Sequence, residues 1–172
     1  MVSRRSLVLG LMLSAGALAA VAVAVPVRAS TRLAPFRARV VRVSDGDSIT
    51  VLQGTVQHRI RLADIDAPER GQPWGRQSQR MLAELVAGAD VEIQPTDTDR
   101  WGRIVARVRT ADGTDVSRAM VSRGGAWAFR RYLTDRSKLQ LEAEARAAGR
   151  GLWALPETER MPPWEWRDRP RG

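Results

Sequence analysis

The chain has 172 residues and a formal net charge of +9 at pH 7, and 44% of its residues are hydrophobic, so it is long and apolar enough to bury one core. It has no cysteine and one histidine, His58, which excludes a zinc site of cysteine and histidine, a cysteine nucleophile and any acid–base mechanism that needs two histidines. The basic charge favours a polyanionic partner, nucleic acid before anionic membrane. Charge alone does not identify that partner, because Lys138 is the only lysine and such an arginine bias also follows from genomic base composition.

Residues 1–29 have the pattern of an export signal. Arg4 and Arg5 precede an apolar run from Leu7 to Val25, and small residues mark a cleavage point before Ser30. The arginine pair also resembles a twin-arginine signal, and the apolar run is long enough to span a bilayer if it is retained. We therefore expect a secreted or periplasmic protein exported by the Sec or twin-arginine route, with an outward-facing, membrane-anchored form as the alternative.

Three β-strands are predicted after the export signal. The runs Val40–Val43 and Ser48–Val51 flank an Asp45-Gly46 step, and Asp-Gly between β-branched runs is a strong hairpin signal. Gly54 then breaks the chain before a third strand over Val56–Leu62, in which His58 is an ordinary strand residue. These strands form a meander.

A helix and two further strands complete a barrel plan. Four apolar residues share one face of a helix that follows Gly75 and ends near Gly88, and we expect them to pack in the core: Met81, Leu82, Leu85 and Val86. Strands are predicted over Val91–Gln94 and Ile104–Val108. Three strands, a helix and two strands are the plan of an OB-fold barrel, a scaffold used to bind nucleic acids and oligosaccharides.

The remaining chain is predicted to be helical and then irregular. Residues 116–123 and 137–148 are expected to form helices that pack beneath the barrel. The fold class is thus α+β, mainly β: a five-stranded OB-fold barrel with about three helices, in a domain over residues 36–155. The tail, residues 156–172, is rich in proline, tryptophan and arginine, and no regular structure is expected beyond Trp153. We expect its tryptophans to pack back onto the domain.

Three polar segments fall in loops or at strand ends: Asp45-Gly46-Asp47-Ser48, residues 61–69 and Asp99-Arg100-Trp101-Gly102-Arg103. Each by itself is explained as a turn. Together they supply carboxylates and arginines that the barrel plan brings to one end. Hydrolysis of a phosphodiester needs such groups, because the transition state carries extra negative charge and a water must be activated.

The residue types suit separate tasks in that reaction. The planar guanidinium groups of Arg61 and Arg103 match phosphate oxygens and keep their charge at working pH. Asp47 and Asp66 offer the oxygen ligands that Ca²⁺ prefers, with waters in the remaining positions. Glu69, held after the rigid Ala67-Pro68 step, is the candidate general base for the water.

These segments together resemble the signature of the staphylococcal nuclease (thermonuclease) family, and the similarity extends from about Val40 to Trp153. The resemblance implies a calcium-dependent OB-fold endonuclease that acts on DNA and RNA and leaves 3′-phosphate ends. It also implies the site residues: Arg61, Glu69 and Arg103 for catalysis, and Asp47, Asp66 and the carbonyl group of Ala67 for Ca²⁺. The chain departs from the family at Ser48, where threonine is frequent, and at Ala67, where the best-known member has threonine.

The resemblance places the substrate-stacking aromatic residues near residues 129–132, with Tyr132 as the candidate. Trp74 follows the Glu69 loop and is given no role. The expected partner is a DNA or RNA substrate; no protein partner is predicted, the chain is expected to be a monomer, and it meets a membrane only if residues 1–29 are retained.

Two other functions compete with the nuclease. One is a non-catalytic OB-fold module that binds nucleic acid without cutting it, and its sign would be the loss of Glu69 or of either arginine. The other is an envelope protein whose basic surface binds anionic lipid, which leaves the three segments unexplained.

Overall fold

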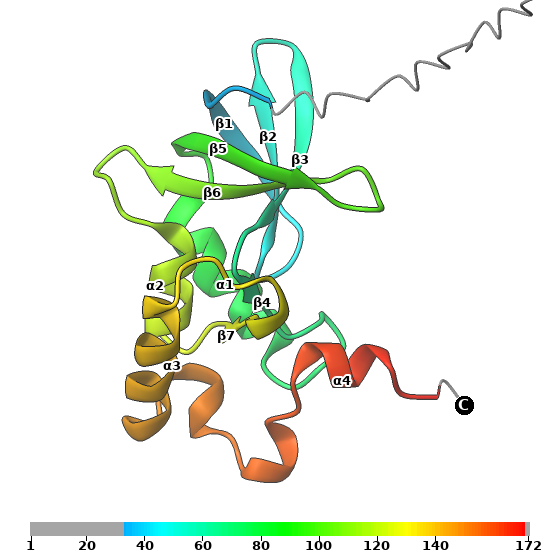
Figure 1. Cartoon of the computed structure of the whole chain (residues 1–172), viewed down its shortest axis with the longest axis vertical. Coiled ribbons are helices and arrows are strands. Elements are labelled where there is room, and N and C mark those ends of the chain that lie inside the picture. Colours follow the sequence, from blue (N-terminus) through cyan, green and yellow to red (C-terminus); the bar gives the residue numbers. More distant parts are fainter. Residues whose placement is uncertain (1–32, 171–172) are drawn as a thin grey trace, which may run out of the picture. The chain divides into compact units, whose positions relative to one another are not determined.

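The computed structural model describes residues 33–170, so the predicted export signal lies outside the described residues. Five strands form a closed barrel with the order β1-β2-β3-β6-β5, in which only the β3–β6 pair is parallel (Figure 1). Their bounds are Phe36–Val43 for β1, Ser48–Gln53 for β2, Val56–Leu62 for β3, Asp90–Thr98 for β5 and Ile104–Thr110 for β6. The predicted OB-fold barrel is confirmed. Across residues 33–170, no helix has the length and apolarity needed to cross a bilayer.

The barrel core consists of alternate residues of the strands, as the period of two requires. Its fully buried members are mostly β-branched or aliphatic: Val40, Ile49, Val51, Ile60, Leu62, Val91, Ile93, Ala106 and Val108. Register is well defined in the β2–β3 hairpin, where Ser48 lies opposite Arg61 and Gln53 opposite Val56. Only Gly54 and Thr55 separate the last pair, and Gly54 has the positive φ of 59° that such a two-residue turn needs.

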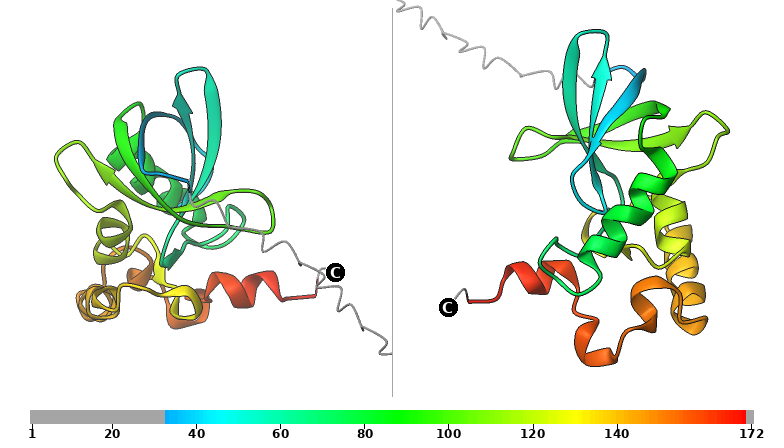
Figure 2. Two further views of the ribbon diagram at one scale, coloured as in Figure 1. Left: turned by 45° about the horizontal axis from the view of Figure 1, so that its top comes forward. Right: turned by 180° about the vertical axis from the view of Figure 1, so that it is seen from behind.

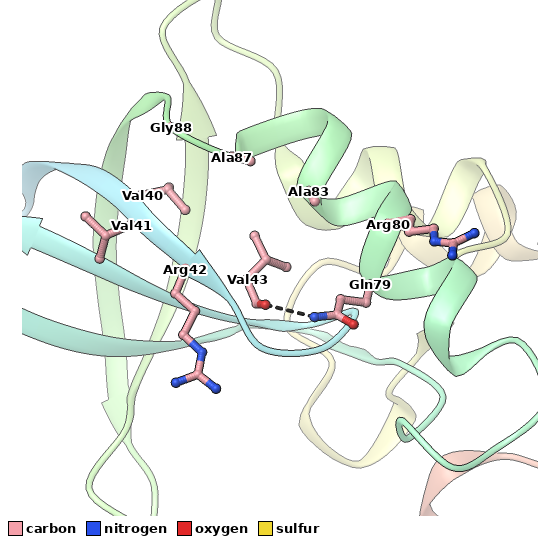
Figure 3. A pocket seen from close by; sticks show the side chains of 9 residues that line it. All are labelled: Val40, Val41, Arg42, Val43, Gln79, Arg80, Ala83, Ala87 and Gly88. Carbon is pink, nitrogen blue, oxygen red and sulfur yellow. Dashed lines mark hydrogen bonds between the residues drawn. The ribbon is translucent and has the colours of Figure 1, made fainter.

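Three helices lie together beyond one end of the barrel (Figures 1 and 2): α1 (Gly75–Val86), α2 (Val116–Ser122) and α3 (Ser137–Ala147). This position was predicted for α2 and α3. Helix α1 buries Leu82 and Val86 in the barrel core. Its Gln79 donates a hydrogen bond of 2.9 Å from Nε2 to the carbonyl oxygen of Val43, at the end of β1 (Figure 3). This bond and the core contacts fix α1 beside the β1–β2 turn.

Strands β5 and β6 are longer than predicted. Strand β5 continues past Pro95 through an irregularity in register, so that Thr98 pairs with Ile104. The β5 residues after Pro95 are polar and exposed, and the hydrophobic pattern used to place strand ends does not extend to them. The extended strands therefore end at the loop that carries Asp99 and Arg103.

The expectation of no regular structure beyond Trp153 is wrong. The short helix η2 (Gly151–Ala154) ends one residue beyond Trp153, and η3 (Glu157–Glu159) and the five-residue helix α4 (Pro163–Arg167) follow it. Trp164 of α4 stacks on Phe129 with ring centroids 5.4 Å apart, so this tail tryptophan does pack on the domain. A five-residue helix is not stable by itself, and α4 exists because of this packing.

Candidate active site

The turn between β1 and β2 directs the carboxylate of Asp47 inward. The backbone N–H of Asp47 donates to Oδ1 of Asp45 at 3.0 Å, which closes the turn. A Cβ atom on Gly46 would lie 1.8 Å from Oγ of Ser78 in α1, so only glycine lets the turn approach the helix this closely. Asp47 is buried, and its Oδ2 accepts a 2.8 Å hydrogen bond from the N–H of Ala67.

Arg61 of β3 joins the two aspartates that are predicted to bind calcium. Its Nη1 lies 3.1 Å from Oδ2 of Asp47 and its Nη2 lies 2.8 Å from Oδ1 of Asp66. The carbonyl oxygens of Leu62 and Ile65 also accept from Nη1, and the Arg61 side chain is only 12% exposed. The guanidinium group is therefore held on several sides by acceptors of the protein.

Asp66 sits on a strand that sequence analysis did not predict. The two-residue strand β4 (Ile65–Asp66) pairs with β7 (Trp127–Ala128), and Asp66 lies opposite Trp127. Strands this short carry no periodic signal, so only the fold reveals them. The pairing fixes the backbone on both sides of the Asp66 carboxylate.

Glu69 lies in the loop that follows β4, and its side chain is 40% exposed. The backbone of Glu69 is clamped by Gln72, whose N–H donates to the Glu69 carbonyl oxygen at 2.8 Å and whose Oε1 accepts from the Glu69 N–H at 3.1 Å. Gly75 packs so tightly against this loop that a Cβ atom would lie 2.0 Å from the Glu69 carbonyl oxygen. A rigid backbone thus presents a carboxylate that solvent can reach.

Arg103 enters from the start of β6. Its Nε donates to Oδ2 of Asp99 at 2.7 Å, and its Nη1 donates to Oγ of Ser48 at 3.1 Å. The Ser48 hydroxyl in turn donates to Oδ1 of Asp47 at 2.9 Å. Arg103 is therefore linked to the carboxylates through one hydroxyl group.

A further arginine, Arg167 of α4, was missed by sequence analysis. Its Nη2 lies 2.7 Å from Oδ2 of Asp66, and its Nη1 lies 2.8 Å from Oε1 of Glu69 and 3.2 Å from Oδ1 of Asp66. Burial alone would lower the pKa of Arg167, but the hydrogen bonds to Asp66 and Glu69 outweigh it and raise that pKa. No local signal marks Arg167, because it stands about 100 residues from its partners in an irregular stretch of sequence.

Two aspartates of the site have pKa values raised mainly by burial. Burial, followed by the negative charge of Asp47, raises the pKa of Asp45 to about 7. Burial also raises the pKa of Asp66 above its ordinary value, against the opposing effects of Arg167 and Arg61. A cation bound here would favour the ionised carboxylates.

The donor set fits a hard cation that keeps much of its water. Only oxygen donors are offered, and within residues 33–170 no group of three or more His, Cys, Asp or Glu side chains is close enough to hold a metal ion by itself. Two aspartates, a backbone carbonyl oxygen and waters suit Ca²⁺ better than a metal that prefers nitrogen or sulfur ligands.

The other residues considered from sequence lie outside this network. Tyr132 is 60% exposed on the 3₁₀-helix η1 (Arg130–Tyr132), with its ring edge against Phe129 at 5.0 Å. Trp74 packs in a tryptophan-rich cluster with Trp127 and Trp153. His58 lies in β3, as expected, with its ring centroid 5.2 Å from that of Phe36.

Comparison with known proteins decides the family. The family model described as staphylococcal nuclease homologue matches residues 59–155, more than half of the chain. The chain belongs to the staphylococcal nuclease family. The matched range contains Arg61, Asp66, Glu69 and Arg103 of the network, whereas Asp47 precedes it and Arg167 follows it.

Three relatives are similar to this chain over most of its length and of theirs. An uncharacterized endonuclease of Escherichia coli is 45% identical over 136 residues, which cover 79% of this chain and 88% of the relative. A micrococcal nuclease of Shigella flexneri is 41% identical over 162 residues, covering 88% and 92%. Protein ParB of Escherichia coli is 42% identical over 159 residues, covering 87% and 89%. Because the chain belongs to this family and resembles proteins named as nucleases, it is a hydrolase of the endonuclease type.

Proposed function

We propose that the chain is a calcium-dependent endonuclease that hydrolyses DNA, RNA or both and leaves 3′-phosphate ends. The observation that carries the proposal is a single network of hydrogen bonds and ion pairs. It runs from Arg103 through Ser48 to Asp47, through Arg61 to Asp66, and through Arg167 to Glu69. Such a network holds phosphate-binding cations and a water-activating carboxylate at one end of the barrel.

Glu69 is the general base in this proposal. Its carboxylate is reached by solvent while its backbone is fixed, so it can accept a proton from a water aligned with the phosphorus atom. Arg61 and Arg103 bind the phosphate oxygens and offset the charge that develops on them. Arg103 is the freer of the two, since its Nη1 is held only by the Ser48 hydroxyl.

Asp47, Asp66 and the carbonyl group of Ala67 would hold Ca²⁺. When bound, Ca²⁺ supplies positive charge that polarises the phosphate and orders the water near it. The raised pKa values of Asp45 and Asp66, caused mainly by burial, support the assignment, because a bound cation would favour the ionised carboxylates. Arg61 keeps the two aspartates in place before the ion arrives.

Tyr132 is proposed to stack on a base of the substrate. Its ring is exposed and braced by Phe129, and aromatic rings with a free face bind single-stranded bases without sequence preference.

Export completes the proposal: the mature protein begins near Ser30 and acts outside the cytoplasm. N-terminal sequencing of the protein recovered from the medium or periplasm tests the cleavage point. Lysine in place of Arg4 and Arg5 tests the twin-arginine route. Recovery of residues 1–29 in the membrane fraction would instead establish the anchored form.

One assay tests the catalytic proposal. The chain is incubated with end-labelled single- and double-stranded DNA and RNA in Ca²⁺, in Mg²⁺ or in chelator. We expect cleavage in Ca²⁺, little in Mg²⁺, which demands a smaller octahedral site, and none in chelator. DNA products should resist polymerase extension until a 3′-phosphatase is added. Binding without cleavage in every metal would favour the OB-fold binding module, and equal rates in Mg²⁺ would refute the calcium assignment.

A further inference from the structure

The C-terminal helix α4 is docked beside the loop that carries Glu69 (Figure 1). Trp164 packs between Phe129 and Trp127, and Pro163 is buried. Nε2 of Gln72, the residue that clamps the backbone of Glu69, also donates a hydrogen bond to the carbonyl oxygen of Met161. The loop and the tail therefore hold each other in place.

Arg167 has donor capacity that the protein does not use. Its three contacts with Asp66 and Glu69 occupy both Nη1 hydrogens and one Nη2 hydrogen. Within residues 33–170, its Nε–H and second Nη2 hydrogen have no protein acceptor, and the side chain is 39% exposed. By contrast, Arg61 is 12% exposed. Arg167 can thus keep its carboxylate partners and still donate to a phosphate.

A cavity of about 420 Å³ opens next to this guanidinium group. It is lined by Glu69, Trp166, Arg167, Arg169 and Pro170, and the guanidinium carbon of Arg169 lies 5.0 Å from the Trp166 ring centroid. Its volume is in the range of small-ligand sites. An aromatic ring with two arginines is the combination that binds a nucleotide, through base stacking and phosphate hydrogen bonds.

We propose that this cavity is a nucleotide-binding subsite of the nuclease, with Arg167 binding the phosphate and Trp166 stacking on the base of a nucleotide adjacent to the scissile bond. The inference rests on the proposed function, because Glu69 lines the cavity and the bound nucleotide must therefore lie next to the bond being cut. Arg167 is then a substrate-binding residue that is also positioned by the catalytic carboxylates.

The test compares Arg167→Ala, Arg167→Lys and Trp166→Ala in the full chain, with Arg39→Ala as a charge-matched control. Arg39 is exposed on β1 opposite Leu52, toward the end of the hairpin away from Ser48. Affinity for a single-stranded oligodeoxynucleotide is measured in chelator across a range of salt concentrations, so that no cleavage occurs. Thermal unfolding verifies that each variant is folded.

Substitutions of Arg167 and Trp166 are expected to change the salt dependence of oligonucleotide affinity differently. Arg167→Ala should weaken binding about tenfold and reduce the slope of log affinity against log salt by about 0.7, the value for one phosphate contact on a single strand. Arg167→Lys should restore the wild-type slope of log affinity against log salt. Trp166→Ala should weaken binding about tenfold with the slope unchanged, because stacking releases no counterions. Arg39→Ala should match the wild type in both measurements.

Steady-state kinetics in Ca²⁺ separates a binding role from disturbance of Glu69. Trp166→Ala should raise KM about tenfold with kcat within about threefold, since a contact made equally in the ground and transition states affects binding alone. Arg167→Ala should raise KM by a similar factor and also lower kcat, because it removes the ion pairs that hold Asp66 and Glu69. Unchanged affinity in both cavity variants, or tighter binding by Arg167→Ala, would overturn the inference. Failure of the wild type to cleave in any metal would refute the proposed function, while the binding data would still decide whether the cavity takes a nucleotide.

Discussion

The ion pair of Lys138 and Asp64 is closed off from water, whereas the charges around Asp66 open onto it. Nζ of Lys138 lies 3.3 Å from Oδ2 of Asp64 and 3.0 Å from Oδ2 of Asp135, and the Lys138 and Asp64 side chains are each 1% exposed. The N–H and hydroxyl of Thr134 also donate to Asp64. Asp66 is equally buried, yet its partner Arg167 is 39% exposed.

The difference separates a cluster that supports the fold from one that can react. Around Lys138 each buried charge is satisfied by the protein, which leaves a substrate nothing to bind. Around Asp66 the carboxylates have raised pKa values and the arginines retain free donors. A bound cation would therefore stabilise the ionised carboxylates, and a phosphate would accept from the free arginine donors. Mutations in the first cluster should therefore change stability, and mutations in the second should change turnover.

Lys138→Met should produce the largest loss of stability. The change leaves Asp64 buried without its cation, and removal of one partner from a buried ion pair costs about 3–5 kcal/mol. Urea unfolding measures the difference. Arg39→Met, which alters an exposed arginine, should stay within about 0.5 kcal/mol of the wild type. Equal stability of Lys138→Met and the wild type would show that the buried ion pair does not support the fold.

Glu69→Gln should leave stability almost unchanged and reduce kcat by about 10² or more, because the amide cannot accept the proton from water. Arg103→Ala should reduce kcat on the same scale through loss of a transition-state donor. Initial rates in saturating Ca²⁺ measure both effects. Glu84→Gln, at an exposed position of α1, is the matched control and should cleave at the wild-type rate. Wild-type rates in Glu69→Gln would mean that another group activates the water.

Asp135→Asn should give a smaller effect that depends on pH. Hydrogen bonds from Ser137 and then Lys138 lower the pKa of Asp135 below its ordinary value of 3.8, so the ionised carboxylate stabilises the fold above about pH 4. That contribution is lost as pH falls further, because the unfolded chain takes up a proton first. The variant should be about 1 kcal/mol less stable than the wild type at pH 7. Urea unfolding should show that this difference in the free energy of unfolding becomes smaller below pH 4. A stability difference that does not depend on pH would exclude the charge of the Asp135 carboxylate as its cause.

Ala67→Thr should have the smallest effect on the metal site. If the carbonyl group of Ala67 contacts Ca²⁺, the side chain is free to vary, and calcium affinity should change by less than about tenfold, or about 1.4 kcal/mol. Asp66→Ala removes a charged ligand and should weaken binding far more. Calcium titration of activity compares the two. Because Ala67 is buried, the larger side chain should also cost about 1–3 kcal/mol of stability. A hundredfold gain in calcium affinity would instead identify the threonine hydroxyl as a ligand.

The sequence predicted the parts of the fold that have local signals. The Asp45-Gly46 turn, the alternating strands and the apolar face of α1 each carry their own pattern, and all of them are present. The structure brings Asp47, Arg61, Asp66, Glu69 and Arg103 together, and their roles remain to be tested. Arg167 was not predictable, because its position depends on the packing of Trp164 rather than on any pattern near it.

The exposed turn at Gly54 and Thr55 determines which residues face each other at the opposite end of the β2–β3 hairpin, where Arg61 lies. Since Gln53 pairs with Val56, every later pair is counted from this turn, up to Ser48 opposite Arg61. A strand that slips by one residue turns each of its side chains to the other face of the sheet. One residue gained or lost at the turn would point the Arg61 guanidinium away from Asp47, so the length of this turn sets the spacing of the charges in the site.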